Sequence, residues 1–115
     1  VHANRVPIEG IVESVERKSG KFLAAFDHKA SDENEQVITV LVNDSGKYII
    51  KQIAGLIARR ILCYAEVGTK MHKGERLGFI RFGSRTDLIM PSHVAVQVEL
   101  GQKVIGGETI IGKIK

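Results

Sequence analysis

The chain has 115 residues, 17 of them Lys or Arg and 13 Asp or Glu, so it fits one domain with a modest core and carries a formal net charge of +4. This balance weakly favours anionic partners such as lipid headgroups. An aromatic content of 5% without Trp argues against a base-stacking surface, so we expect no nucleic-acid partner. Cys63 is the one cysteine, which excludes an internal disulfide, and no apolar run reaches the roughly 20 residues that cross a bilayer.

The first half of the chain predicts strands separated by polar turns. Residues 11–16 combine apolar Ile11, Val12 and Val15 with polar Glu13, Ser14 and Glu16, which indicates a half-buried strand. Residues 27–35 are polar without a period and predict an exposed loop. Residues 36–43 are β-branched and apolar on both faces, which is typical of a strand buried on both sides. An Asp-Ser-Gly turn at residues 44–46 then predicts a hairpin, with the returning strand over residues 48–53.

The second half continues with short extended segments between glycines. Residues 54–60 fit either one helical turn or a strand with a glycine break, and the pattern does not decide between them. Residues 61–64 predict an extended run. Apolar segments at 77–80 and 88–90 flank a polar segment. Strands of about five residues with glycines between them are typical of barrels and sandwiches, so we expect one all-β domain over residues 1–115 with little helix.

An internal repeat supports this fold class. Residues 66–80 and 99–114 match in sequence, and each copy predicts strand, glycine turn, second glycine turn and strand. Two such hammerheads facing each other would form a pseudo-symmetric barrel-sandwich, as in lipoyl and biotinyl carrier domains. The matched positions are Glu66 with Glu99, Gly68 with Gly101, Lys70 with Lys103, Gly74 with Gly107 and Glu75 with Glu108.

Few segments of the chain suggest chemistry by themselves. Gly83 and Ser84 lie between two arginines, and on local grounds they are ordinary turn residues. The four histidines share no metal-ligand spacing, so we expect no metal site. Lys70 lies near a turn, where a carrier domain presents its modified lysine, but we interpret this segment as a solvated basic turn.

Several short segments, in order along nearly the whole chain, carry a family resemblance. Together they resemble the phosphatidylserine decarboxylase family, and most closely its short branch in bacteria and archaea, which includes archaetidylserine decarboxylases. The segments are VHANRVP at 1–7, Gly10, GKF at 20–22, AS at 30–31, ENE at 33–35, QIAG at 52–55, ARRI at 58–61, GERLG at 74–78 and FGSR at 82–85.

The resemblance implies that the proenzyme cuts itself between Gly83 and Ser84. The serine hydroxyl attacks the preceding carbonyl and turns the amide into an ester. β-Elimination then breaks the ester, and hydrolysis of the new N-terminus leaves a covalent pyruvoyl cofactor derived from Ser84. Residues 1–83 would belong to the β-chain and residues 84–115 to the α-chain. The pyruvoyl carbonyl would form a Schiff base with the amine of a serine phospholipid, which loses CO2 to give the ethanolamine phospholipid.

The remaining site residues also follow from the resemblance. His2 matches a family histidine and is expected to transfer protons. Arg5 occupies the place of a second family histidine, and Arg5 and Arg85 are expected either to bind the substrate carboxylate or phosphate or to be exposed, solubilising side chains. The family's catalytic aspartate belongs to an upstream Ala-Asp-Gly motif that this chain lacks, and the chain starts at Val1 without Met. We therefore interpret it as a fragment or processed product, inactive alone.

The expected partners are an anionic phospholipid, the membrane surface and the chain's own cleaved half, with homo-oligomerisation left open. We expect a peripheral location on the cytoplasmic side of the cell membrane, because the chain is basic and has no spanning segment. The alternative is a non-enzymatic barrel-sandwich carrier or adaptor domain. Two bands on a denaturing gel would indicate the proenzyme, and a mass addition on Lys70 would indicate the carrier.

Overall fold

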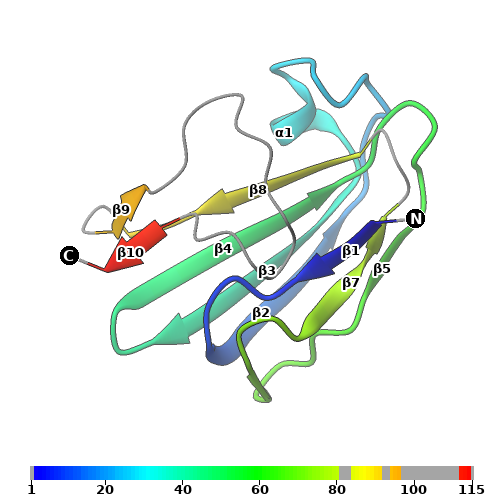
Figure 1. Cartoon of the computed structure of the whole chain (residues 1–115). Helices are drawn as coiled ribbons and strands as arrows, with labels where there is room; N and C mark the ends of the chain where they lie inside the picture. The colour runs from blue at the N-terminus through cyan, green and yellow to red at the C-terminus, as the bar shows by residue number, and fades with distance from the viewer. Residues whose placement is uncertain (1, 81–83, 92–93, 97–111, 115) are drawn as a thin grey trace.

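The computed structural model describes residues 2–80, 84–91, 94–96 and 112–114, and it is built mostly from antiparallel strands (Figure 1). This confirms the predicted all-β class with little helix. The elements are β1 (His2–Arg5), β2 (Gly10–Lys18), α1 (Ala30–Glu33), β3 (Gln36–Asn43), β4 (Gly46–Ile53), β5 (Ile61–Cys63), β6 (Lys70–Met71), β7 (Arg76–Ile80), β8 (Arg85–Ile89), β9 (Val94–Val96) and β10 (Gly112–Ile114).

Two curled sheets form a half-barrel. The larger sheet has the order β6-β2-β3-β4-β8, the smaller sheet has the order β1-β7-β5, and β9 and β10 form a separate pair. Strand β2 changes register against β3 between Val12 and Ser14, and such a bulge bends a strand and increases its twist. Figure 1 shows the short strands β1, β7 and β5 lying across one face of the larger sheet.

The core lies between the two sheets. One cluster of buried side chains joins β2, β3 and β4 to Leu77 of β7, and a second joins Val37 of β3 to Ile61 of β5 and Ile80 of β7. Within β3, Val37, Thr39 and Leu41 are buried, whereas on the other face only Gln36 is buried and Ile38, Val40 and Val42 are half-buried. Residues 36–43 therefore form the predicted strand, but only one face of it is fully covered.

The predicted hairpin after β3 is confirmed. Asn43 pairs with Gly46 across the turn, and Gly46 has a φ of 131°, a conformation that an L side chain rarely adopts. The side-chain Oδ1 of Asn43 accepts hydrogen bonds from the backbone N and the hydroxyl of Ser45 at 2.8 and 2.6 Å. The turn is thus determined by its own residues, which is why the sequence located it.

The prediction of an exposed loop over residues 27–35 is wrong in part. The segment contains α1, and both Ala30 and Asn34 are fully buried. Asn34 is buried because its side chain bonds the backbone of Leu23 and the carbonyl of Ala54 at 2.7 to 2.9 Å. A polar residue that satisfies distant backbone groups looks like a loop residue in the sequence.

The undecided segment 54–60 is irregular, and its Gly55 N–H donates to the carbonyl of Ala58 at 3.0 Å. The first copy of the sequence repeat has glycine turns at Gly68 and Gly74, where φ is 87° and 85°. The second copy lies outside the described residues, apart from 112–114, so the predicted twofold relation of the hammerheads stays a prediction. In the part that the structure describes, no helix is long and apolar enough to cross a membrane.

Candidate functional site

Ser84 lies where the chain passes from one sheet to the other. Strand β7 ends at Ile80 between β1 and β5, whereas β8 begins at Arg85 and pairs with β4. The flanking strands therefore do not pair with each other, and this segment is not a hairpin loop. Gly83, the other side of the predicted cut, lies outside the described residues.

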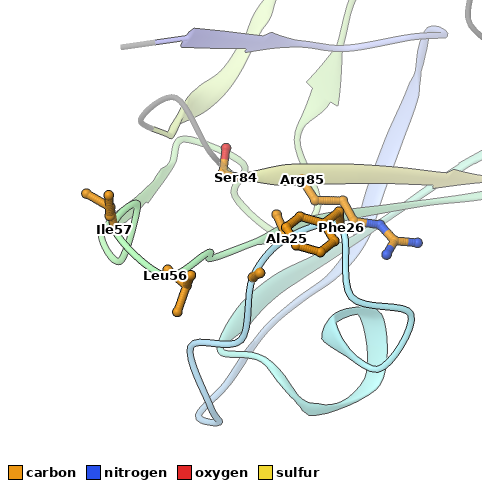
Figure 2. A pocket seen from close by; sticks show the side chains of 7 residues that line it. Ala25, Phe26, Leu56, Ile57, Ser84 and Arg85 are labelled. Atoms are coloured by element: carbon orange, nitrogen blue, oxygen red, sulfur yellow. The ribbon is translucent and has the colours of Figure 1, made fainter.

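A cavity of about 790 Å³ opens beside Ser84 (Figure 2). Its apolar rim consists of Phe26, Leu56 and Ile57, whose residue surfaces are 92%, 56% and 80% exposed. Large apolar side chains exposed together on a surface commonly mark a binding site. The lining residues are Ala24, Ala25, Phe26, Leu56, Ile57, Ser84 and Arg85.

Two irregular segments supply this apolar rim. Phe26 follows the short apolar run that begins at Phe22, and Leu56 and Ile57 lie in the segment after β4. Arg59 fixes the second segment, since its Nε donates to the carbonyl of Leu56 at 2.9 Å and its guanidinium lies 4.6 Å from the centre of the Phe22 ring. The sequence analysis missed the rim, although apolar residues outside any strand period were its available signal.

Arg85 lines the cavity but is already paired. Its Nε donates to Oδ1 of Asp87 at 2.7 Å, and Oδ2 of Asp87 accepts from the Ser31 hydroxyl at 2.8 Å. Lys51 donates to the Ser31 carbonyl at 2.8 Å and to the Ser31 hydroxyl at 3.2 Å, so a second cation contacts the serine that donates to Asp87. Figure 2 shows the Arg85 guanidinium extending away from the Ser84 hydroxyl. The substrate-binding role of Arg85 stays a prediction. A substrate anion would have to compete with the Asp87 carboxylate for the Arg85 guanidinium.

The other predicted residues lie on β1. His2 at the start of β1 pairs with Ile80 at the end of β7. The chain continues from Ile80 towards Ser84, so β1 begins at the edge of the smaller sheet where the chain leaves it. Arg5 lies at the opposite end of β1, is exposed, and donates to the carbonyl of Gly74 at 2.9 Å. It is not among the residues that line the cavity. Ser84 and Arg85, which are neighbours in the sequence, both line the cavity, whereas Arg5 does not.

The basic segment around Lys70 is an exposed ion cluster. His72 Nδ1 lies 2.9 Å and Lys70 Nζ 3.5 Å from the same carboxylate oxygen of Glu9. The hydrogen bond with His72, followed by the charge of Lys70, lowers the pKa of Glu9 below its ordinary value. Lys70 lies within β6 and pairs with Ile11, so it is not the hairpin-tip lysine of a carrier domain.

No cluster of three or more metal-ligating side chains occurs among the residues described here.

Comparison with known proteins shows which family this chain resembles. A family model described as phosphatidylserine decarboxylase matches residues 1–112. A phosphatidylserine decarboxylase proenzyme of Wolbachia sp. subsp. Brugia malayi is 49% identical over 115 residues, which are 99% of this chain and 50% of that protein. One from Geobacter metallireducens is 50% identical over 113 residues, covering 97% of this chain and 52% of the relative.

An archaeal relative matches at similar strength. The protein of Methanococcoides burtonii named "Putative archaetidylserine decarboxylase proenzyme" is 44% identical over 115 residues, which cover 100% of this chain and 55% of that protein. The chain thus spans about half the length of the curated relatives it matches. No solved structure matches it.

Proposed function

This chain belongs to the phosphatidylserine decarboxylase family, and from that membership we propose that the protein containing it converts phosphatidylserine, or a related serine phospholipid, into the ethanolamine phospholipid with release of CO2. The observation that supports this most is the position of Ser84 beside a cavity with an apolar rim. A diacyl lipid requires an apolar surface for its tails next to the group that reacts with its headgroup.

We propose that Ser84 is the residue at which the protein cuts itself. The serine oxygen bonds to the carbonyl carbon of Gly83 while the peptide C–N bond breaks, which leaves an ester and a free amine. Loss of the Ser84 α-proton and of the ester oxygen then releases the Gly83 carboxylate. Addition of water and departure of ammonia leave pyruvoyl at position 84. His2 is our candidate for the proton transfers, because the strand that carries it begins opposite the end of β7.

The surroundings of Ser84 fit a pyruvoyl group. Strand β8 pairs with β4 over five residue pairs from Ile49↔Ile89 to Ile53↔Arg85, so a cut before residue 84 would leave the new chain end attached to a strand that the sheet still holds. The cavity leaves room in front of that end. When bound, a pyruvoyl group supplies an electrophilic carbonyl that accepts the electron pair left as CO2 departs. Ser84 is half-buried, so the chain's own residues cover this position in part.

The same surface supports peripheral binding to an anionic membrane. Arg59 and Arg60 are exposed and follow Leu56 and Ile57 after the single residue Ala58, so basic groups lie close to the apolar rim in the chain. Apolar side chains inserted at the headgroup boundary, with cations beside them, are the usual means by which a protein binds a lipid surface from one side. We extend this to a location on the cytoplasmic face of the cell membrane.

Substitution of Ser84 in the full protein tests the proposal. The unaltered protein should yield a chain that begins at position 84 with pyruvoyl, resists Edman sequencing and reacts with carbonyl reagents. Ser84→Ala should remain uncut and inactive, because it lacks the nucleophile. The matched control is Ser19→Ala, which removes an exposed hydroxyl after β2 and should be cut normally. Cutting before position 84, or lipid decarboxylation, by Ser84→Ala would refute the proposal.

A further inference from the structure

A short series of side-chain hydrogen bonds links the two sheets beside Ser84. The Nε2 of Gln52 on β4 donates to Oδ1 of Asn4 on β1 at 3.0 Å, and Nδ2 of Asn4 donates to the hydroxyl of Thr86 on β8 at 3.1 Å. The same Gln52 nitrogen also lies 3.2 Å from the carbonyl of Leu62 on β5. Three side chains therefore connect strands from both sheets.

The location of this link relates it to the proposed chemistry. Asn4 lies two residues after His2 on β1, and Thr86 lies two residues after Ser84 at the start of β8. In Figure 1, β1 and β8 run in the same direction. Two residues of strand span about 7 Å. The Asn4–Thr86 bond therefore lies about 7 Å along β1 from His2 and about 7 Å along the chain from Ser84.

Gln52 anchors the link in the interior, whereas the Asn4–Thr86 bond itself lies at the surface and Thr86 is exposed. Gln52 is fully buried, and its Oε1 has no hydrogen-bond partner among the described residues. An apolar side chain of similar size would avoid the cost of burying that oxygen. The amide nitrogen, by contrast, is used twice, and one of its acceptors is the oxygen of Asn4. Gln52 thus holds the Asn4 amide so that its nitrogen is directed at Thr86.

We propose that Asn4, Gln52 and Thr86 are positioning residues for self-cleavage. They hold β1 against β8, so that the ends of these strands, which carry His2 and Ser84, keep a fixed separation. This inference rests on the proposed function, because it assigns the three residues to the same reaction at Ser84. Strands β1 and β8 belong to different sheets and share no backbone ladder, so side chains have to set their spacing.

A matched pair of variants at Thr86 tests the link in the full protein. Thr86→Val removes the hydroxyl and keeps a branched side chain that suits a strand, whereas Thr86→Ser keeps the hydroxyl. We expect the cleavage rate to fall roughly 10- to 100-fold in Thr86→Val, because small displacements of reacting groups have effects of that size. Thr86→Ser should restore most of the rate. The pH profile of cleavage should keep its shape, since none of the three side chains titrates in the working range.

A double variant gives an independent test. Asn4→Ala removes the same bond from the other strand, so Asn4→Ala combined with Thr86→Val should cleave no more slowly than Asn4→Ala alone. The inference is overturned if Thr86→Val cleaves at the original rate. It is also overturned if Thr86→Ser is as slow as Thr86→Val, or if the two losses multiply. Ser84→Ala separates the two proposals: if it is cut, the proposed function fails, whereas an uncut Ser84→Ala with a fast Thr86→Val refutes only the positioning role.

Discussion

Replacing the two most exposed rim side chains should detach the protein from anionic membranes. The double substitution Phe26→Ser with Ile57→Ser leaves the described core untouched, because both residues lie outside it and are 92% and 80% exposed. Moving a Phe or Ile side chain out of water is favourable by about 2 kcal/mol. Scaled by the exposed fractions, the pair contributes about 3 kcal/mol on full insertion, which corresponds to roughly a 100-fold change in the partition coefficient.

Sedimentation with vesicles of phosphatidylserine and phosphatidylcholine measures that change in the full protein. Val67→Ser is the matched control, since Val67 is 65% exposed but does not line the cavity, and it should partition as the unaltered protein does. Added salt should weaken binding further, because Arg59 and Arg60 lie close to the rim in the chain. Equal losses in the control and the double variant, or no loss in either, would contradict the reasoning.

A tryptophan at the rim distinguishes a lipid from another occupant. In Phe26→Trp, the fluorescence added over the parent protein should shift to the blue when vesicles are added, and brominated lipids should quench it. A signal that is already shifted without vesicles would mean that protein covers the rim, and the membrane-binding role of this surface would be wrong.

Two further predictions concern the scaffold. Gly78→Ala should destabilise the protein by about 3 kcal/mol or more, because the added Cβ would overlap the backbone carbonyl of Leu62 in the neighbouring strand. Gly68→Ala should cost only about 1 kcal/mol, since space around Gly68 is open and only its φ of 87° is unfavourable; equal denaturant midpoints would contradict this ranking. The pKa of Glu9 is lowered, so its carboxylate stabilises the fold above pH 4.5 and this contribution is lost as the pH falls below 4.5. Glu9→Gln should therefore lower the melting temperature more at pH 7 than at pH 3, and a constant difference would exclude the ion cluster as the cause.

The sequence by itself determined the local features of this protein. Alternating and β-branched residues predicted the strands, and the Asp-Ser-Gly turn predicted the hairpin between β3 and β4. Glycines at positions 68 and 74 marked turns that the structure shows with positive φ. These features depend on residues that are near one another in the chain, so a local pattern is sufficient to reveal them. The motif around Ser84 was likewise visible as a resemblance.

Only the tertiary structure decided what surrounds Ser84. Local sequence does not specify which strand pairs with which, and here the chain leaves β7 in one sheet and joins β4 in the other. That crossing brings Ser84 beside Phe26 and Ile57, which belong to two irregular segments far apart in the chain. The packing of the two sheets also brings Asn4 and Gln52 within hydrogen-bond distance, although in the sequence both are ordinary polar residues. Such contacts arise from the packing of the whole chain, because hydrogen bonds and burial between distant segments leave no periodic signal in either segment.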